Sequence, residues 1–255
     1  MQVNIEGKTR QDILQAAFKA GKAGAHVAPS LSLVEISLAV LDVYDRAKDV
    51  VVLSKGHGAL GYYAAMHQKG FISDAQFSSF EENGGEFPGQ PSRTKTNCID
   101  YSGGTLGVGL SYATGCVIAG KRAFVILGDG EMNEGSNWEA ADLAAKMNLN
   151  RLFAIVDNNG LQSDGECDNI CAQNLAKIWS AHGWDVISCD GHSTNCIKEA
   201  IIKHNGDKPL AIIAKTTKGK GVSFMENNNE WHHHELTEEK LKESLLEVEQ
   251  KYGLS

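Results

Sequence analysis

Short apolar runs, rich in β-branched and aromatic side chains, recur along the chain and alternate with helical patterns. The runs are nearly continuous in apolar residues, which is typical of strands covered on both faces. Strands that alternate with helices predict an α/β fold with a doubly wound, mainly parallel sheet and helices on both of its faces. The strand candidates are DVVVL (49–53), AFVIL (123–127), LFAIV (152–156), WDVIS (184–188) and LAIIA (210–214).

Helix start signals lie between these runs. The segments SLVE (32–35) and SDAQ (73–76) have the spacing of a capping box, in which a serine and a later Glu or Gln bond the first N–H groups of a helix. Small apolar residues at helical spacing predict a helix over 134–147. Residues 218–235 are polar and 237–252 are charged and amphipathic, so we expect a long loop followed by a final helix.

Length and composition fit one domain over residues 1–255, because 42% of the chain is hydrophobic and no linker or repeat marks a boundary. The net charge is -8 with both signs scattered, which disfavours nucleic acid or a membrane surface as the main partner. The N-terminus is polar, the apolar runs are strand-sized, and none of the six cysteines forms a CxxC pair. We therefore expect a cytoplasmic protein with reduced thiols and no zinc site.

Polar residues follow two consecutive strand candidates. GDG ends one apolar run, and DNNGLQ (157–162) follows the next. Ligands of open parallel sheets bind at the carboxyl ends of the strands, so we expect Asp129 to share a crevice with the amides Asn158 and Asn159. Carboxylate, amide and backbone oxygens suit a hard cation such as Mg²⁺ or Ca²⁺. Because Mg²⁺ usually keeps positions for phosphate oxygens, a diphosphate ligand is implied.

The turn after Asp129 also suits an anion. Gly128 and Gly130 let the backbone approach a ligand closely, and the helix that opens near Glu134 directs N–H groups and its positive dipole end toward the crevice. GDG alone fits an ordinary turn aspartate equally well. The NN pair at the end of the following strand makes a metal–diphosphate site the more specific interpretation, and neither a P-loop nor a GxGxxG fingerprint occurs here.

These motifs resemble those of thiamine diphosphate enzymes, and the chain from about Gln11 to His232 is similar to the N-terminal half of transketolases. The resemblance implies the thiamine diphosphate-binding fold and the activity of a transferase. The segments that carry it are GAHVAPSLSLVE (24–35), LSKGHGALGYYAAMHQKG (53–70), SGGTLGVGLSYATG (102–115), GDGEMNEGSNWEAADLAAKMNLNRLFAIVDNNGLQSDG (128–165), DGH (190–192) and KTTKGKGVSFMENNNEWH (215–232).

The resemblance also implies a set of binding residues. Mg²⁺, with Ca²⁺ or Mn²⁺ as substitutes, would be held by Asp129, Asn159 and the backbone carbonyl of Leu161. Gly104 would lie at the aminopyrimidine of thiamine diphosphate and Leu106 against its rings. The other cofactor-binding residues that it implies are His57, Gly128, Gly130 and Glu134, the last of them at a subunit interface near the cofactor.

Three histidines are candidate catalytic residues. His57 directly follows a strand candidate in SKGHG, and by resemblance it lies against the diphosphate and the substrate. His26 resembles the histidine that approaches the substrate near the reacting carbon. His232 resembles a late histidine that contacts both diphosphate and substrate, and the HHH run leaves His233 as a substitute. Loop histidines that face solvent are the ordinary alternative for all of them.

Some positions leave the chemistry open. Many transketolases have PGHP where this chain has PGQP, and Gln90 cannot change its charge near pH 7 as a histidine can. Gln90 therefore leaves room for an unusual donor or acceptor. Lys218 and Lys220 flank glycines and fit either a substrate phosphate or a solvated loop, and Cys167 and Cys171 are expected to be incidental.

The resemblance covers only one half of a cofactor site. Thiamine diphosphate needs a carboxylic acid at N1′ of its aminopyrimidine, and in the family a glutamate of the second, pyrimidine-binding half supplies it. The chain ends with the helix over 237–252, where that half would begin. We therefore expect a separate C-terminal subunit that carries the pyrimidine-binding domain, in an α2β2 heterotetramer.

The main hypothesis is thus the N-terminal subunit of a two-component, transketolase-like enzyme. It would move a two-carbon ketol unit from a ketose or ketose phosphate to an aldose. A second hypothesis keeps the cofactor but passes the two-carbon unit to a carrier-protein thiol or a lipoyl group. The α subunits of 2-oxoacid dehydrogenases share GDG and NN, but SKGHG and AHVAPSLS favour transketolase. Outside enzymes, the alternative is a cofactor-binding or regulatory module without catalysis.

Overall fold

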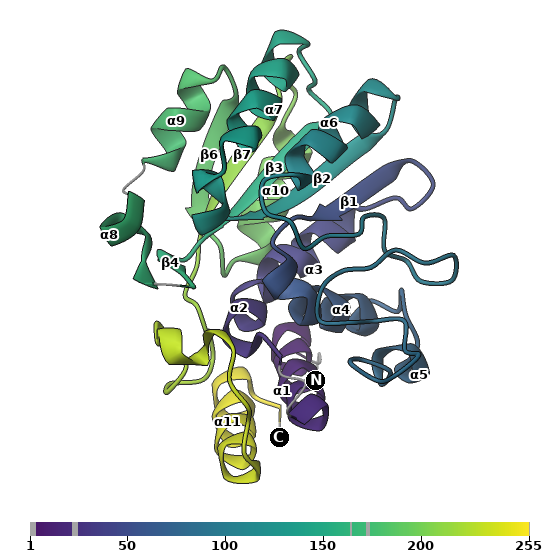
Figure 1. Cartoon of the computed structure of the whole chain (residues 1–255), viewed down its shortest axis with the longest axis vertical. Coiled ribbons are helices and arrows are strands. Elements are labelled where there is room, and N and C mark those ends of the chain that lie inside the picture. The colour runs from purple at the N-terminus through teal and green to yellow at the C-terminus, as the bar shows by residue number, and fades with distance from the viewer. Residues whose placement is uncertain (1–3, 22–24, 164, 172–173, 255) are drawn as a thin grey trace.

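Five parallel strands form the central sheet of the computed structural model (Figure 1), which describes residues 4–21, 25–163, 165–171 and 174–254. The strand order is β1-β2-β3-β7-β6. All five predicted strands are present, and the prediction of an α/β fold with a mainly parallel sheet is confirmed. Their bounds are β1 Asp49–Leu53, β2 Arg122–Gly128, β3 Leu152–Asn158, β6 Asp185–Asp190 and β7 Leu210–Lys215, while β4 Leu161–Gln162 and β5 Gly165–Glu166 form a small antiparallel pair.

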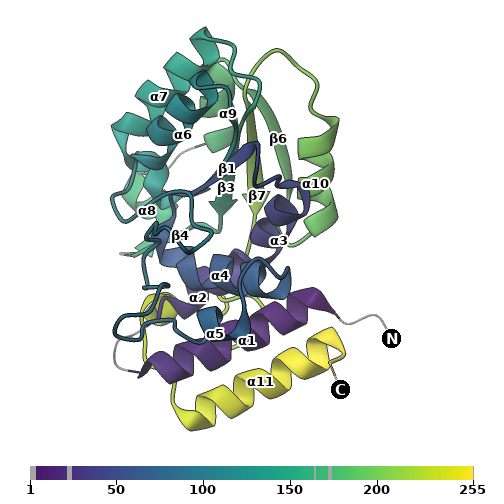
Figure 2. The same cartoon turned by 90° about the vertical axis from the view of Figure 1, so that its right-hand side faces the viewer.

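Helices cover both faces of the sheet (Figure 2). Alternate residues of each strand point to opposite faces, so Phe124 and Ile126 join one buried apolar cluster and Val125 and Leu127 join the other. Burial on both faces explains why β2 and β3 are continuously apolar. One face carries α3 Val34–Val43 and α10 Thr194–Lys203, and the other carries α6 Gly109–Ile118, α7 Gly135–Lys146 and α9 Leu175–Ala181. Helix α4 Ala59–Gln68 packs against α3 near the carboxyl ends of the strands.

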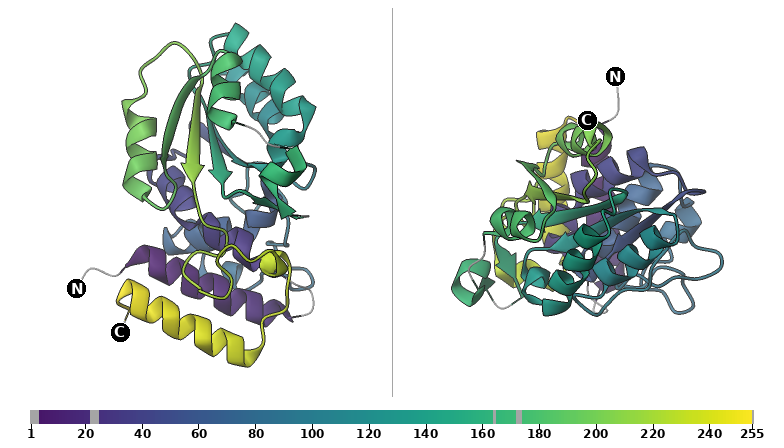
Figure 3. Two further views of the ribbon diagram at one scale, coloured as in Figure 1. Left: turned by 90° about the vertical axis from the view of Figure 1, so that its left-hand side faces the viewer. Right: turned by 90° about the horizontal axis from the view of Figure 1, so that it is seen from above.

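A further layer of helices lies at the edge of the sheet formed by the carboxyl ends of the strands (Figure 3). Helices α1 (Ile5–Ala20) and α11 (Glu238–Tyr252) pack side by side there, so segments from the two ends of the sequence share one layer. The expected final helix is present, with Thr237 as its N-cap. The short helices are α2 Val27–Ser32, α5 Asp74–Phe77, α8 Cys167–Cys171, η2 Gly56–Gly58, η3 Gly130–Asn133 and η4 Asn229–His232.

The predicted capping box at 32–35 is wrong. Helix α2 ends at Ser32, and α3 begins at Val34 with no side-chain cap. Ser32 instead donates through Oγ to Asp157 at 2.7 Å, while Glu35 pairs with Arg10 at 2.7 Å. The box at 73–76 is confirmed, because Ser73 and Gln76 make both of its hydrogen bonds. Both side chains of the first segment are buried and bond to residues distant in the sequence, so neither one caps a helix.

Two other expectations need correction. β6 lies at the edge of the sheet and most of its residues are partly or fully exposed, so it is not covered on both faces. The stretch 218–235 is mainly a loop, but it contains η4 and buries Lys218, Val222 and Met225. Polarity along this stretch therefore does not mean solvation.

The parallel register brings three strand ends to one edge of the sheet. Leu53 pairs with Ile126 and Gly128 pairs with Asp157, so the segments that follow β1, β2 and β3 emerge together. Gly24 and Asp164, which belong to two of the motifs quoted above, lie outside the described residues. Among the residues that are described, none of the helices is both long and apolar enough to cross a membrane.

Candidate active site

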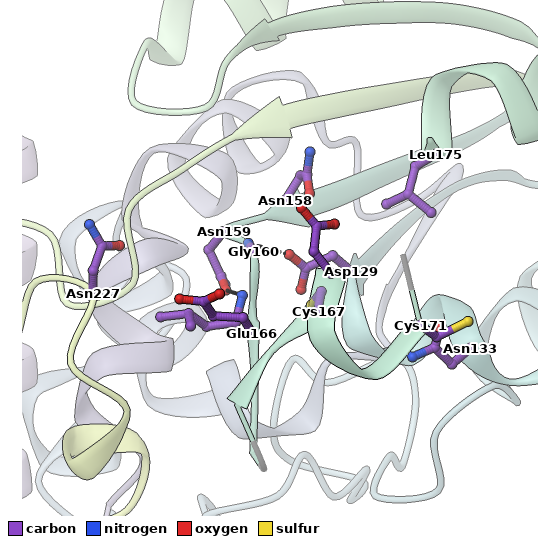
Figure 4. Close-up of a pocket in the computed structure, with 12 residues that line it drawn as sticks. Asp129, Asn133, Asn158, Asn159, Gly160, Glu166, Cys167, Cys171, Leu175 and Asn227 are labelled. Carbon is purple, nitrogen blue, oxygen red and sulfur yellow. Dashed lines mark hydrogen bonds between the residues drawn. The ribbon is translucent and has the colours of Figure 1, made fainter. Parts of the chain in front are cut away.

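A pocket of about 440 Å³ lies where β2 and β3 end (Figure 4). The Asp129 carboxylate lies at its centre, with Asn158 and Asn159 beside it. The structure therefore brings together the residues that follow the two strands, as their positions at neighbouring carboxyl ends require. The lining residues are Asp129, Asn133, Asn158, Asn159, Gly160, Leu161, Glu166, Cys167, Asp168, Cys171, Leu175 and Asn227.

Backbone amides hold the Asp129 carboxylate in place. Its Oδ1 accepts from the N–H of Gly130 at 2.9 Å and its Oδ2 from the N–H of Gly160 at 2.6 Å. Burial raises the pKa of Asp129, because the charged form loses its hydration. Asn159 accepts through Oδ1 from the N–H of Leu161 at 3.0 Å. All three residues expected to hold a metal line this one pocket.

A buried ion pair lies beneath the pocket. Asp157, the second-last residue of β3, is fully buried and pairs with the ammonium group of Lys55. It also accepts from Thr216 Oγ1 and from Asn159 Nδ2, the latter at 3.3 Å. Burial alone would raise the pKa of Asp157, but the charge and hydrogen bond of Lys55 outweigh it and lower the pKa. Asp157 is therefore a buried carboxylate that fixes both Lys55 and the amide of Asn159.

Sequence reasoning did not identify Lys55, although it precedes His57 by two residues in the same SKGHG motif. A lysine at the carboxyl end of a strand carries no pattern that distinguishes it from a solvated one. Its burial depends on the partner carboxylate of Asp157, which arrives from a strand about 100 residues later in the chain. The position of the lysine directly after β1, next to a candidate histidine, is the clue that was available.

Glu131 anchors the glycine-rich loop before α6. Its carboxylate is buried and accepts from the N–H of Gly107 at 2.9 Å, from the N–H of Gly128 at 3.3 Å and from Ser54 Oγ. Burial raises its pKa, and the three donors oppose that change. One side chain thus ties together the segments that follow β1 and β2 and the loop between them.

The loop itself is exposed. Gly104 has φ 135°, which only glycine adopts readily, and an added Cβ there would meet open space. Leu106 and Val108 are 42% and 43% exposed. Glu134 is also exposed and does not line the pocket, and an added Cβ on Gly107 would meet its side chain at 2.6 Å. Gly104, Leu106 and Glu134 therefore lie on an open surface beside the pocket.

The three candidate histidines come together from distant segments. His26 precedes α2, His57 lies in η2 and His232 ends η4. The rings of His26 and His57 stack with centroids 4.1 Å apart, and His57 Nδ1 lies 3.0 Å from His232 Nε2. His233 is exposed, although its ring lies 4.8 Å from that of His26. The geometry thus gives His232, rather than His233, the hydrogen bond to His57.

Burial keeps the histidine cluster neutral. It lowers the pKa of His26 and of His232 to about 3, with added repulsion from His57 in the first case and from Lys218 in the second. The pKa of His57 is lowered as well, by burial and then by the charge of Lys55. At neutral pH these rings therefore act as hydrogen-bonding groups without charge.

Lys218 lies inside the protein, so the solvated alternative for this lysine is wrong. The residue is only 1% exposed, and its Nζ lies 2.7 Å from Asn229 Oδ1 and 2.8 Å from His232 Nδ1. Burial, and then the nearby charge of Lys55, lower its pKa to about 8, although Asp129 and Asp157 oppose the effect. Lys55 and Lys218 thus place two cations between the histidine cluster and the acidic pocket.

The residues present fit a divalent cation with a diphosphate. The pocket offers carboxylate, amide and backbone oxygens, which hard cations prefer. Within the described part of the chain, the buried Nε2 of Gln162 has no hydrogen-bond partner, and Gln162 packs against Gly130. That donor and the ammonium groups of Lys55 and Lys218 could bind phosphate oxygens. Oxygen ligands and anion-binding donors therefore occur side by side.

Gln90 packs against the same segment as the histidine cluster. An added Cβ on Gly56 would meet Gln90 Oε1 at 1.8 Å, so the amide lies directly over the residue before His57. In the described structure this Oε1 is buried without a hydrogen-bond partner. Cys167 and Cys171 line the acidic pocket, and burial together with Asp129 raises the pKa of Cys167 to about 12, so its thiol stays protonated.

Comparisons with known proteins agree with this geometry. The family described as the thiamine diphosphate binding domain of transketolase matches residues 41–255. The chain is 38% identical over 229 residues to an apulose-4-phosphate transketolase subunit of Actinobacillus succinogenes, covering 83% of each chain. It is 37% identical to the 6-deoxy-6-sulfo-D-fructose transketolase subunit SqwG of Clostridium sp., covering 90% of each.

A solved structure shows the same fold. Transketolase from Campylobacter jejuni superposes with a TM-score of 0.86 at 25% identity. The match covers 100% of this chain but only 44% of that one, so the chain spans less than half of the solved enzyme. The family match, the relatives and the fold agree with one another. The chain belongs to the transketolase family of transferases, in which it corresponds to the thiamine diphosphate-binding domain.

Proposed function

We propose that this chain is the cofactor-binding subunit of a two-component transketolase and that it holds Mg²⁺ and thiamine diphosphate. The observation that carries the proposal is the pocket at the ends of β2 and β3, in which Asp129, Asn159 and Leu161 offer three kinds of oxygen ligand. The partly buried Lys55 and the buried Lys218 lie nearby. The relatives from Actinobacillus succinogenes and Clostridium sp. are named as transketolase subunits, which supports the same assignment.

Each group of residues has a distinct role in this proposal. Asp129, Asn159 and the carbonyl of Leu161 bind the metal, while Lys55 and Lys218 bind diphosphate oxygens. When bound, thiamine diphosphate supplies the electron sink needed to break the bond next to a ketose carbonyl. His26, His57 and His232 line the approach to it as neutral donors and acceptors, and they orient the substrate oxygens. The donor ketose leaves as an aldose two carbons shorter, and the acceptor aldose becomes a ketose two carbons longer.

A partner subunit completes the site. Leu106 and Val108 expose large apolar side chains on the loop that Glu131 fixes beside the pocket. An apolar ring of the cofactor on that loop would remain exposed to water, and a second chain packed there would exclude that water. We expect this partner to carry the pyrimidine-binding domain and the N1′ glutamate, in an α2β2 heterotetramer.

A different acceptor is the second candidate function. The unpartnered Oε1 of Gln90 lies over Gly56, next to the histidine cluster, where many transketolases have a histidine. A neutral amide changes which substrate oxygens can be bound there. Acyl transfer of the two-carbon unit to a carrier-bound lipoyl group, whose disulfide takes up the two electrons released, therefore competes with transfer to an aldose. Analysis of the products formed with an aldose phosphate as acceptor and with a lipoyl-bearing carrier protein as acceptor distinguishes these two functions.

Calorimetry tests the cofactor assignment. We expect thiamine diphosphate to bind the chain when Mg²⁺, Ca²⁺ or Mn²⁺ is present and to lose affinity when EDTA removes the metal. Thiamine without its diphosphate should bind far more weakly, because the metal and both lysines act on phosphate oxygens. Metal-independent binding, or equal binding of thiamine, would refute the proposal.

A further inference from the structure

A chain of hydrogen bonds links Lys218 to His57 through His232. Lys218 Nζ lies 2.8 Å from His232 Nδ1, and His232 Nε2 lies 3.0 Å from His57 Nδ1. The second partner of Lys218 is Asn229 Oδ1, at 2.7 Å. All of these atoms belong to partly or fully buried side chains.

The direction follows from the chemistry of the groups. An ammonium group only donates, so His232 Nδ1 must accept. A neutral imidazole carries one proton, and the proton of His232 is therefore on Nε2. That N–H points at His57 Nδ1, which must accept in turn. His57 then carries its own proton on Nε2.

We infer that Lys218 is a positioning residue that fixes the tautomers of His232 and His57, so that His57 presents an Nε2–H donor. Asn229 holds the ammonium group from the other side. Stacking of the His26 ring on His57 at 4.1 Å, with an interplanar angle of 6°, keeps the donor ring in one orientation. A donor fixed before the ligand arrives needs no reorganisation when it binds an oxygen anion.

Metal binding is the competing use of these rings. One ring nitrogen from each of His26, His57 and His232 lies within 4.8 Å of the others, which is close enough for a shared ion. A metal needs an unprotonated nitrogen from each ring. His232 has only Nε2 left, because Nδ1 accepts from Lys218, and Nε2 carries the proton. A dication would also lie next to the buried ammonium group, so the contacts favour hydrogen bonding.

The use of the His57 donor on a diphosphate or substrate oxygen rests on the proposed function, whereas the tautomers themselves do not. The test is long-range ¹H–¹⁵N NMR of the full chain labelled at histidine, at pH 7 and without cofactor. Single replacements of His26, His57 and His232 by Gln assign the signals. We expect both His57 and His232 to carry their proton on Nε2, and a proton on Nδ1 of either ring would overturn the inference.

Variants of Lys218 show whether the lysine is the cause. In Lys218→Met, donation in either direction becomes possible, so we expect the Nδ1–H forms of His57 and His232 to appear together above about a tenth of the population. Lys218→Arg keeps a donor and should preserve the native tautomers. A Lys218→Met spectrum with native tautomers would contradict the inference. If Lys218→Met does not fold, the wild-type spectrum still decides.

Activity is measured separately, with a ketose phosphate and with the partner subunit present. Native tautomers in a chain that transfers no ketol unit would refute the proposed function and leave the inference intact. Ketol transfer by a chain with His57 protonated on Nδ1 would refute the inference and leave the proposed function intact.

Discussion

At the scale of single residues, the proposed metal site depends most on Asp129. Its carboxylate is buried, and two backbone N–H groups, of Gly130 and Gly160, fix both of its oxygens. Burial disfavours its charge until a cation compensates, which is the physical reason for its raised pKa. The same side chain therefore costs stability when the pocket is empty and supplies binding energy when a cation is present.

Replacing Asp129 tests this balance. In Asp129→Asn the shape is kept and the charge is lost, so Mg²⁺-dependent affinity for thiamine diphosphate should fall about 100-fold, or roughly 2.7 kcal/mol. The free chain should change little in heat stability, because loss of the buried charge offsets the one backbone N–H bond that the asparagine amide cannot accept. Calorimetry and thermal unfolding check the two parts, with Asp207→Asn, at an exposed aspartate outside the pocket, as the matched control. Unchanged metal-dependent affinity in Asp129→Asn would contradict the metal assignment.

The shared pocket of Asp129 and Asn159 could be predicted because strand ends and motif spacing are local properties of the sequence. Lys55 and Lys218 could not, because both are buried by partners more than ten residues away, namely Asp157 and Asn229. The cluster of His26, His57 and His232 lies between these cases. Resemblance named each ring, but only the fold shows that they touch and that His232 is the one bonded to His57.

At the scale of elements, buried polar contacts join the outer helices to the sheet layers. Arg10 of α1 pairs with Glu35 of α3 at 2.7 Å, and Glu35 also accepts from His192 at 3.0 Å. Arg10 donates as well to the backbone carbonyl of Lys220 and lies over the ring of Tyr252 in α11. Four separate segments thus meet at one guanidinium group.

Removing one partner should be costly. Glu35→Ala leaves the Arg10 charge buried without its carboxylate, and we expect the free energy of unfolding to fall by about 3–5 kcal/mol. Urea unfolding measures the change. Glu139→Ala, on the exposed side of α7, is the control and should change it by less than about 0.5 kcal/mol. Equal effects of the two replacements would show that the buried pair contributes nothing.

His67 gives the helical layer a pH dependence. Burial lowers its pKa, but hydrogen bonds to Asp74 of α5 and Asp12 of α1 outweigh burial and raise it above 6.5. A raised folded pKa means that the stabilisation is fully present below the unfolded pKa of about 6.5 and is lost as pH rises through the folded value.

The size of that effect should be small, about 0.5 kcal/mol, because Asp74 is almost fully exposed. Unfolding of wild type and His67→Gln should therefore differ more at about pH 6 than at about pH 9. His234→Gln, an exposed histidine, is the control. A difference that grows with pH would show that the sign is wrong.

Element prediction succeeded where the pattern reflects what an element buries and failed where side chains found distant partners. β1, β2, β3 and β7 are buried on both faces, and their apolar runs predicted them within two residues at each end. The 32–35 segment has the letters of a capping box, yet Ser32 and Glu35 bond to Asp157 and Arg10. A local sequence pattern contains no information about such distant hydrogen-bond and ion-pair partners.

At the scale of the whole molecule, the chain resembles one half of a larger enzyme. The structural match covers 100% of this chain but only 44% of the solved Campylobacter transketolase. The relative from Actinobacillus succinogenes is covered over 83% of its length, so proteins of similar extent occur in the family. The exposed apolar loop around Leu106 lies beside the pocket, where we propose that the second subunit docks.

The most direct test of the account is the rate of two-carbon transfer from a ketose phosphate to an aldose phosphate, with thiamine diphosphate and Mg²⁺ present. It is measured for the purified chain alone and after one-to-one mixing with a subunit that carries the pyrimidine-binding domain, encoded by an adjacent gene. The account predicts no turnover above background for the chain alone and full turnover for the mixture. Full turnover by the chain alone would contradict it.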